Sequence, residues 1–204
     1  MGDGRFGVYC GCSCLLIIGG GVLCLIIFLN ILPFKAIKFH IIDASLTEFY
    51  VTNDVVLHYN LAVNISVRNS NKMDRMSYHG IRSNPSCYGR DLSTVSLPSF
   101  RQGTKNTTLL HPVFQGQILF KLGGSHLRDF NNDQRDGIYK MDVNLYLTLQ
   151  VKHAGGDKGV KLPFTVNCGL MRLHLLGSSS SSNNQTRIGG LFKPTRCKAN
   201  GPPA

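Results

Sequence analysis

The chain has 204 residues, with 22 Lys and Arg against 11 Asp and Glu, for a formal net charge of +11. All of this excess lies beyond residue 34, where 21 basic and 10 acidic side chains stand and Glu48 is the single Glu. So few carboxylates disfavour acid–base catalysis by paired acids. The basic excess indicates acidic binding partners. Beside a membrane, lipid headgroups or acidic polysaccharide are favoured over nucleic acid. Because Lys and Arg form no clustered run, a charge that only keeps the surface soluble is the alternative.

The first predicted element is a membrane-spanning helix over residues 8–34. Residues 6–34 carry no charge, Arg5 and Lys35 flank them, and the central run reads LLIIGGGVLCLIIFLNIL. About 20 apolar residues in a helix cross a bilayer core of about 30 Å. Residues 1–7 are then a short cytosolic tail. A cleaved signal peptide is the alternative, but its apolar region has roughly 7–15 residues and ends at a small-x-small site, which this run lacks.

Strict alternation of apolar and polar residues predicts three long strands, each with one buried face. They read VVLHYNLAVNISVRN, YKMDVNLYLTLQVK and VKLPFTVNCGL, with Val160 to Leu170 alternating inward in the last. Shorter candidates are IKFHIIDASLTEF, the segment around Tyr78, LSTVSLPSF and QILFKL, separated by the turn-forming strings SNPS, RQGTKN and LGGSH.

No helical periodicity is visible outside residues 8–34, so the predicted fold class is all-β. About seven strands at this spacing favour an antiparallel β-sandwich of the immunoglobulin or fibronectin type III kind, preceded by a single N-terminal transmembrane helix. The sandwich domain is assigned to residues 35–199, with a low-complexity loop at 177–185 and a disordered tail at 200–204.

Seven cysteines divide by position. Cys10, Cys12 and Cys14 stand at the start of the predicted span and are candidates for acylation, with unmodified helix residues as the alternative. Cys168 points inward near the end of its strand, and the apolar string LFKPTRC could bring Cys197 beside it. An oxidising compartment would allow a disulfide between these two, and a buried free thiol is the alternative.

Motifs for catalysis, cofactors and metals are missing from the sequence. It contains no Gly-x-Ser-x-Gly elbow, no His-Glu-x-x-His, no phosphate-binding Gly-rich loop and no Cys-x-x-Cys pair. Asp129, Asp133 and Asp136 have the wrong spacing for a calcium loop and are interpreted as part of a solvated turn. His58 and His174 are interpreted as surface residues of strands. We therefore expect no catalytic residue, no cofactor and no metal.

Four strings carry a resemblance to a known family. They are NSNKMDRMSYHGI, LPSFRQGTKNTTLLHPVFQGQ, GIYKMDVNLYLTLQVK and TRCK. With them the chain resembles the plant harpin-induced, non-race-specific-disease-resistance-like proteins, whose soluble part is a late-embryogenesis-abundant type 2 domain. One departure is Ser70, where the family usually has proline, and the loss loosens a turn by up to about 1 kcal/mol. The resemblance implies a plasma-membrane protein with an extracellular β-sandwich and a role in immune responses.

Two sequence signals disagree on the side of the membrane. Lys35 and Lys38 outweigh the N-terminal flank and weakly favour a cytosolic domain. Three glycosylation sequons argue for an extracellular domain instead, and begin at Asn64, Asn106 and Asn184. Together with the resemblance, the sequons decide for a single-pass plasma-membrane protein with its C-terminal domain outside the cell.

Two non-enzymatic functions remain. One is a membrane-tethered interaction module in plant defence signalling or in adhesion to the cell wall, whose partners would be membrane or immune-signalling proteins, acidic cell-wall polysaccharide or anionic lipid. The other is a lipid-binding or membrane-contact module that accepts an acyl chain. Arg101 and Lys105 bracket a predicted turn, so both should face water and are candidates for charge-mediated binding.

Overall fold

A computed structural model describes residues 17–26, 37–152, 159–176 and 192–200. The chain forms two compact units, Met1–Ala36 and Ile37–Ala204. In the first unit residues 17–26 are helical. Among the described residues, no helix has the length and apolar content needed to cross a membrane. The predicted tail, the acylation candidates Cys10, Cys12 and Cys14, and most of the predicted span lie outside the described residues.

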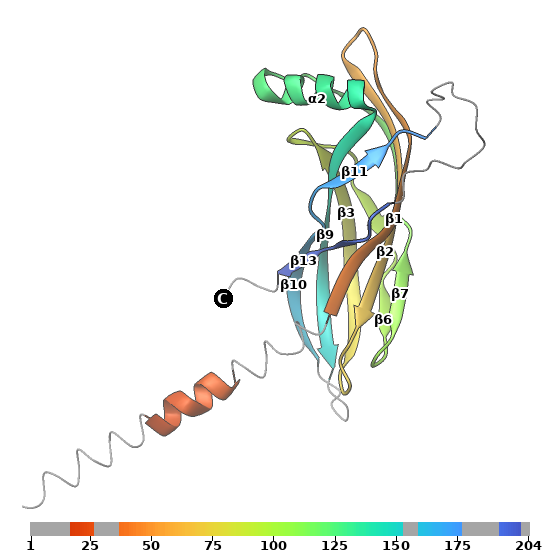
Figure 1. The fold of residues 1–204 in the computed structure, drawn as a ribbon. Helices are drawn as coiled ribbons and strands as arrows, with labels where there is room; N and C mark the ends of the chain where they lie inside the picture. Colours follow the sequence, from red (N-terminus) through yellow and green to blue (C-terminus); the bar gives the residue numbers. More distant parts are fainter. Residues whose placement is uncertain (1–16, 27–36, 153–158, 177–191, 201–204) are drawn as a thin grey trace, which may run out of the picture. The chain divides into compact units, whose positions relative to one another are not determined.

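The second unit contains two antiparallel sheets, whose longer strands run along the long axis of the domain in Figure 1. The first sheet has the order β12-β1-β2, and both β7 and β8 pair with the free side of β2. Its strands are β1 Ile37–Val51, β2 Val56–Asn69, β7 Thr107–Leu110, β8 Val113–Leu119 and β12 Thr195–Arg196.

The second sheet has the order β13-β10-β9-β3, with β11 on β9 and three short strands on the free side of β3. Its strands are β3 Arg75–Cys87, β4 Arg90–Asp91, β5 Val95–Leu97, β6 Phe100–Gln102, β9 Ile138–Lys152, β10 Val160–Asn167, β11 Met171–His174 and β13 Lys198–Asn200. The fold is therefore mostly antiparallel β-sheet, as the alternation predicts.

The core lies between the inward faces of the two sheets. Every second residue of β2 and of β9 is buried, which confirms the faces predicted for both strands. Phe39 of β1 meets Phe164 of β10 with ring centroids 6.2 Å apart, so side chains of both sheets contact each other. For β10 the predicted inward face is confirmed at Phe164 and Val166 but is wrong at Val160, which is exposed. Leu170, predicted to continue this face, lies beyond the strand and is also exposed. β13 pairs only with Thr165 to Asn167, which leaves the first half of β10 without that neighbour.

β3 is a single strand, Arg75–Cys87, although the sequence pattern predicts a turn within it. The string SNPS, read as a turn, lies inside this strand. The cause is a change of phase at an irregularity between His79 and Arg82. Met76 and Tyr78 are buried before it, whereas Ile81 within it and Ser83 after it are buried. A bulge of this kind shifts which residues face the core. A count of alternating apolar residues across the bulge therefore finds no consistent buried face.

A helix that the sequence analysis excluded is α2, Gly124–Asp136, which contains the supposed solvated turn at Asp129, Asp133 and Asp136. Its buried side chains are Phe130 and Asp133, so one of the two inward positions is acidic. Counting apolar residues cannot find such a stripe. Figure 1 shows α2 at the end of the domain that lies away from β6 and β7.

Phe130 anchors α2 in an aromatic cluster. Its ring lies 5.6 Å from Tyr88, 5.7 Å from Phe120 and 6.3 Å from Phe49, centroid to centroid. Edge-to-face arrangements dominate the cluster, as the ring quadrupole favours. Tyr88 also has φ of 49°, beside Gly89 at 73°, in the turn between β3 and β4.

The last described segment links the two sheets. β12 pairs with β1 of the first sheet, and two residues later β13 pairs with β10 of the second. Cys197 stands between these strands, its N–H donates to the carbonyl of Phe39, and its sulfur is bonded to that of Cys168 at 2.11 Å. Asn200, assigned to the disordered tail, instead pairs with Thr165 in β13. Residues 201–204 and the low-complexity segment 177–185 lie outside the described residues.

Candidate functional site

Two turns meet at the end of the domain where β1 begins. One connects β2 to β3 through residues 70–74, and the other connects β6 to β7 through residues 103–106. Ile37 pairs with Asn69, which places the start of the domain beside the first turn. The N–H of Lys105 donates to the carbonyl of Asn71 at 3.1 Å, and that of Asn69 to the carbonyl of Asn106 at 2.9 Å. The turns therefore hold each other in place.

Asn side chains fix the first turn. Asn69 donates from Nδ2 to the carbonyls of Asp74 and Gly103, each at 2.9 Å, and accepts the N–H of Asn71 on Oδ1. Asn71 in turn accepts the N–H of Met73 on Oδ1 and donates to the Asp74 carboxylate. Local side-chain to backbone bonds of this kind are typical of Asx turns. They constrain a turn that has no proline.

A buried Gln fixes the second turn. Gln102 donates from Nε2 to the carbonyl of Val67 at 2.7 Å and to Oγ1 of Thr108 at 2.9 Å. Its Oε1 accepts the hydroxyl of Tyr78 at 3.0 Å. Burial raises the pKa of the Tyr78 hydroxyl well above its ordinary value, so it stays a donor. A buried network in which each member is satisfied rigidifies its surroundings.

Four cationic side chains surround a hollow of about 760 Å³ above these turns. They are Arg75, Arg101, Lys105 and Lys152, contributed by the start of β3, by β6, by the second turn and by the end of β9. Arg101 and Lys105 are exposed, as predicted from the sequence. Lys105 has φ of 52°, a left-handed conformation that is uncommon outside glycine. The Gly103, Thr104 and Asn106 positions complete the rim.

Three more cations, Lys38, Arg68 and Lys72, lie on the strands and turn at this end and are exposed. We call the seven side chains together the cationic end. They are Lys38, Arg68, Lys72, Arg75, Arg101, Lys105 and Lys152. The carboxylate placed among them is Asp74, which is buried.

Like charges face each other twice across the strands of the cationic end. Lys38 is paired in register with Arg68, and Arg75 with Lys152. Like charges directly opposite on a sheet destabilise it, by about the 0.2–1 kcal/mol that such pairs usually contribute. The ion pair between Lys140 and Asp133 lies at the opposite end of the domain. The cationic end is therefore ready to receive an anion.

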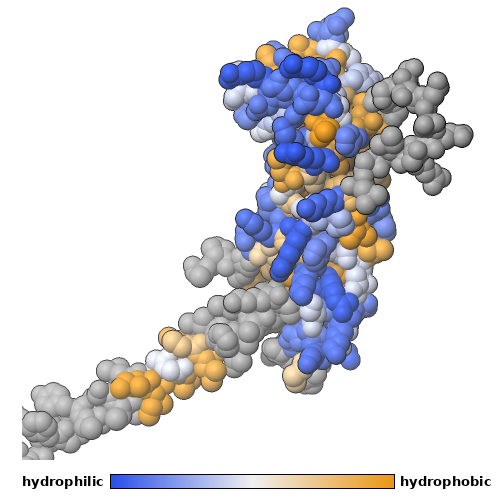
Figure 2. Space-filling model, viewed as in Figure 1, coloured by the Kyte–Doolittle hydropathy of each residue, from blue (hydrophilic) through white to orange (hydrophobic). Residues whose placement is uncertain are grey.

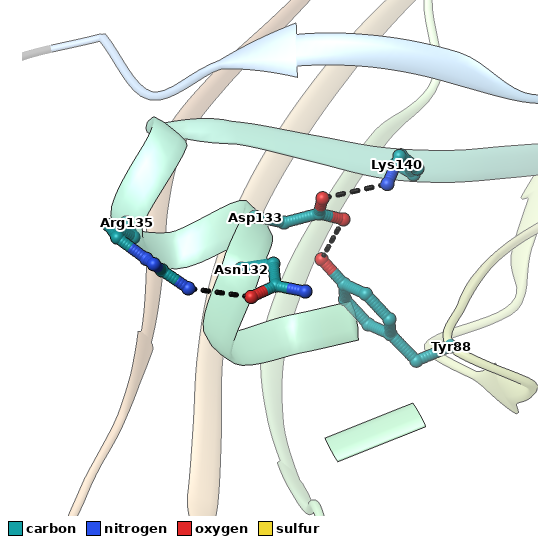
Figure 3. A network of polar contacts seen from close by, with 5 residues as sticks. All are labelled: Tyr88, Asn132, Asp133, Arg135 and Lys140. Carbon is teal, nitrogen blue, oxygen red and sulfur yellow. Dashed lines mark hydrogen bonds and ion pairs between the residues drawn. The ribbon is translucent and has the colours of Figure 1, made fainter. Parts of the chain in front are cut away.

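Acidic side chains gather instead at the α2 end. Asp129, Asp133 and Asp136 lie on α2, Asp54 in the turn between β1 and β2, and Asp91 in β4. Figure 3 shows how Asp133 is held: it accepts the hydroxyl of Tyr88 at 2.8 Å and receives Lys140 at 2.7 Å. Burial, then the bond to Asp133, raises the pKa of Tyr88 above its ordinary value. Lys140 also faces Arg172 across β9 and β11, so the Asp133 carboxylate lies beside a pair of like charges. Cations lie at this end too, namely Arg90, Lys121, Arg128, Arg135, Lys140 and Arg172, so its charges nearly balance. The surplus of positive charge is therefore greater at the cationic end.

The remaining predicted sites lie apart from the cationic end or at its edge. Asn64 is on the outer face of β2, where it donates to Asp43 at 3.2 Å and meets His111 at 2.7 Å. Asn106 is exposed on the hollow, and its Oδ1 accepts the N–H of Thr107. Asn184 lies outside the described residues. His174 is exposed and His58 half-buried.

Two features bear on catalysis and on lipid capture. Burial, with a smaller contribution from Asp142, raises the pKa of the Cys87 thiol to about 12, which keeps it protonated. Among the described residues, no group of three His, Cys, Asp or Glu side chains is close enough to hold a metal. A second hollow, of about 860 Å³, mixes Ile42, Leu170 and Phe192 with Arg172 and His174 in its lining.

Sequence reasoning found only part of this site. Arg75 and Lys152 are 77 positions apart in the numbering and meet only through the pairing of β3 with β9. Gln102 was treated as a turn residue, although it is buried. A signal was present, since it lies two residues after Phe100 on the same strand face, but its polarity hid it.

Comparisons with known proteins identify the class to which this fold and site belong. No family model matches the chain. It is 37% identical over 198 residues to NDR1/HIN1-like protein 10 of Arabidopsis thaliana, covering 92% of this chain and 84% of the relative. NDR1/HIN1-like proteins 3 and 2 of the same plant are 35% and 31% identical, over 87% and 85% of this chain and 73% and 69% of their own lengths. The chain belongs to the NDR1/HIN1-like family.

Two solved structures were also found. A solution structure of an Arabidopsis thaliana protein is 18% identical with a TM-score of 0.36, over 68% of this chain and 81% of that one. A crystal structure of an Archaeoglobus fulgidus protein is 13% identical with a TM-score of 0.30, over 65% of this chain and 94% of that one.

Proposed function

We propose that this chain is a plasma-membrane-anchored, non-enzymatic protein that contributes to plant defence through an interaction module outside the cell. In this proposal residues 8–34 are the single transmembrane helix, and the two sheets form an immunoglobulin- or fibronectin III-like sandwich of the late-embryogenesis-abundant type 2 class. Membership of the NDR1/HIN1-like family supports the role in defence.

The observation that carries the proposal is the cationic end. It combines exposed cations with turns that are fixed by buried hydrogen bonds. Pre-organised charges lose little entropy when they bind, so the arrangement suits recognition of an acidic partner. Membrane or immune-signalling proteins, acidic cell-wall polysaccharide and anionic lipid are the partner classes of this proposal, and nucleic acid is not among them. Acyl-chain capture is less favoured because charged side chains interrupt the second hollow.

An experiment in leaves tests the proposal. The full chain and the double variant Arg101→Glu/Lys105→Glu are expressed at equal levels in a plant that lacks the protein. We expect the wild-type chain to restore the hypersensitive response to an avirulent pathogen and the variant to restore it poorly. Lys121→Glu/Arg128→Glu changes the charge equally at the α2 end, where both side chains are exposed, and serves as the matched control. Equal responses with and without the wild-type chain would refute a role in defence.

A further inference from the structure

The geometry points to one partner for the cationic end: we infer that it docks on the surface of the bilayer that anchors the chain, with its cations on phosphate-bearing anionic headgroups. This deepens the proposed function and rests on its membrane anchor. Because the domain and the anchor belong to one chain, the leaflet that the domain meets is the one on its own side of the membrane.

Position along the fold is the first argument. Ile37, the first residue of the domain, pairs with Asn69, whose side chain reaches Gly103 of the second turn. The hydrophobic sequence up to residue 34 therefore joins the domain at the cationic end and not at the α2 end. A domain that is tethered at its most cationic end keeps those cations within reach of a negative membrane surface.

Charge is the second argument. The two like-charge pairs, Lys38 with Arg68 and Arg75 with Lys152, destabilise the isolated domain. Anionic headgroups would neutralise both pairs at once. Hydrophilic side chains cover the end that carries β6 and β7 in the view of Figure 2, as a surface that meets headgroups requires.

An apolar side chain at the tip is the third argument, and it separates lipid from polysaccharide. Met73 lies in the first turn with 70% of its surface exposed, next to Lys72. A cationic surface gains nothing from an exposed Met when it binds a hydrated polysaccharide. At a bilayer, by contrast, cations can meet phosphates while an apolar side chain enters the headgroup region.

The absence of Trp from the chain supplies a clean reporter. The full chain carrying Thr104→Trp is produced in bacteria, so that Asn106 bears no glycan, and is reconstituted in vesicles that contain a dansyl-labelled lipid. Energy transfer from the single Trp reports how close the cationic end lies to the headgroups. Leu127→Trp, on the exposed face of α2, is the control reporter.

We expect strong transfer from position 104 in phosphatidylcholine mixed with phosphatidylglycerol, and weak transfer in phosphatidylcholine alone. Each cation near an anionic surface is worth a factor of about five. Arg101→Glu/Lys105→Glu should therefore lower the docked-to-undocked ratio by a factor of at least about 25 at low salt. Lys121→Glu/Arg128→Glu should leave it unchanged, and position 127 should show little dependence on the lipid.

Three results would overturn the inference or redirect it. Transfer from position 104 that is equal in both lipids and insensitive to the charge reversal would exclude docking. Loss of transfer on adding polygalacturonate, together with no effect of Met73→Ser, would assign the surface to polysaccharide. If alkaline carbonate extracts the wild-type chain and the variant alike, the anchor itself is wrong, and the proposed function fails separately from the docking.

Discussion

The bond between Cys168 and Cys197 should stabilise the domain under oxidising conditions only. The two residues are 29 positions apart, and closing a loop of this length is worth about 3.5 kcal/mol in the chain-entropy model. For a domain of 150–250 residues this corresponds to roughly 7–14 °C in Tm. Cys168 is fully buried and Cys197 nearly so, so removing either sulfur also costs packing, under all conditions.

The assay is thermal unfolding of the wild-type chain, both single Ser variants and the double variant, each with and without reductant. Under oxidising conditions either single substitution should remove the contribution of the bond. The second substitution should then cause little further loss of stability, because the two residues act as one unit. Under reduction the losses of stability caused by the two substitutions should be small and additive. Equal losses in both conditions would refute the bond and indicate two packed thiols.

Three further predictions concern single sites. Asn64 and Asn106 should carry glycans in plant cells. Glycosidase treatment should therefore increase the gel mobility of the protein, and Asn→Gln at both positions should abolish that change. No change in mobility, together with a domain that protease reaches only in opened cells, would exclude an extracellular domain. Phe130→Ala should destabilise the domain by about 3–5 kcal/mol because the ring is buried in the aromatic cluster, whereas Leu127→Ala on the exposed side of α2 should cost under about 1 kcal/mol; equal losses would contradict this packing. Burial raises the pKa of Asp142, so its ionised form opposes folding, and the stability present below about pH 4 is lost as pH rises through the folded pKa. Asp142→Asn should therefore raise stability at pH 7 by less than about 1 kcal/mol, and urea unfolding that shows no gain, or a gain only in acid, would contradict it.

Two of the long strands, β2 and β9, could be predicted because their alternation has no interruption. Leu57 to Val67 in β2 and Met141 to Val151 in β9 are buried at every second position. β3 defeats the same reasoning because its phase changes near Gly80, which has φ of 57°. Period-two patterns therefore identify regular strands and miss those with a bulge.

The helix and the cationic end show the other limits. The inward face of α2 includes Asp133, whose burial depends on Lys140 and Tyr88 from elsewhere in the fold. Only tertiary structure can supply such a partner, so local periodicity gives no warning of it. Arg101 was accessible to sequence reasoning because turns are exposed. Arg75 was not, since its neighbour Lys152 comes from a strand distant in the chain.

The segment around Cys197, which links the two sheets, affects how the domain folds during synthesis. His40 and Ile41 in β1 pair with Arg196 and Thr195 in β12, so part of the outer edge of β1 is covered by a segment that is made much later. Contacts between such distant parts of a chain form slowly. Until the ribosome has released the segment around Cys197, the edge of β1 presents unpaired backbone groups that can recruit a strand from another molecule. The segment around Cys197 therefore closes the edge of β1 late in synthesis, and a nascent chain that stalls before it would be prone to aggregate.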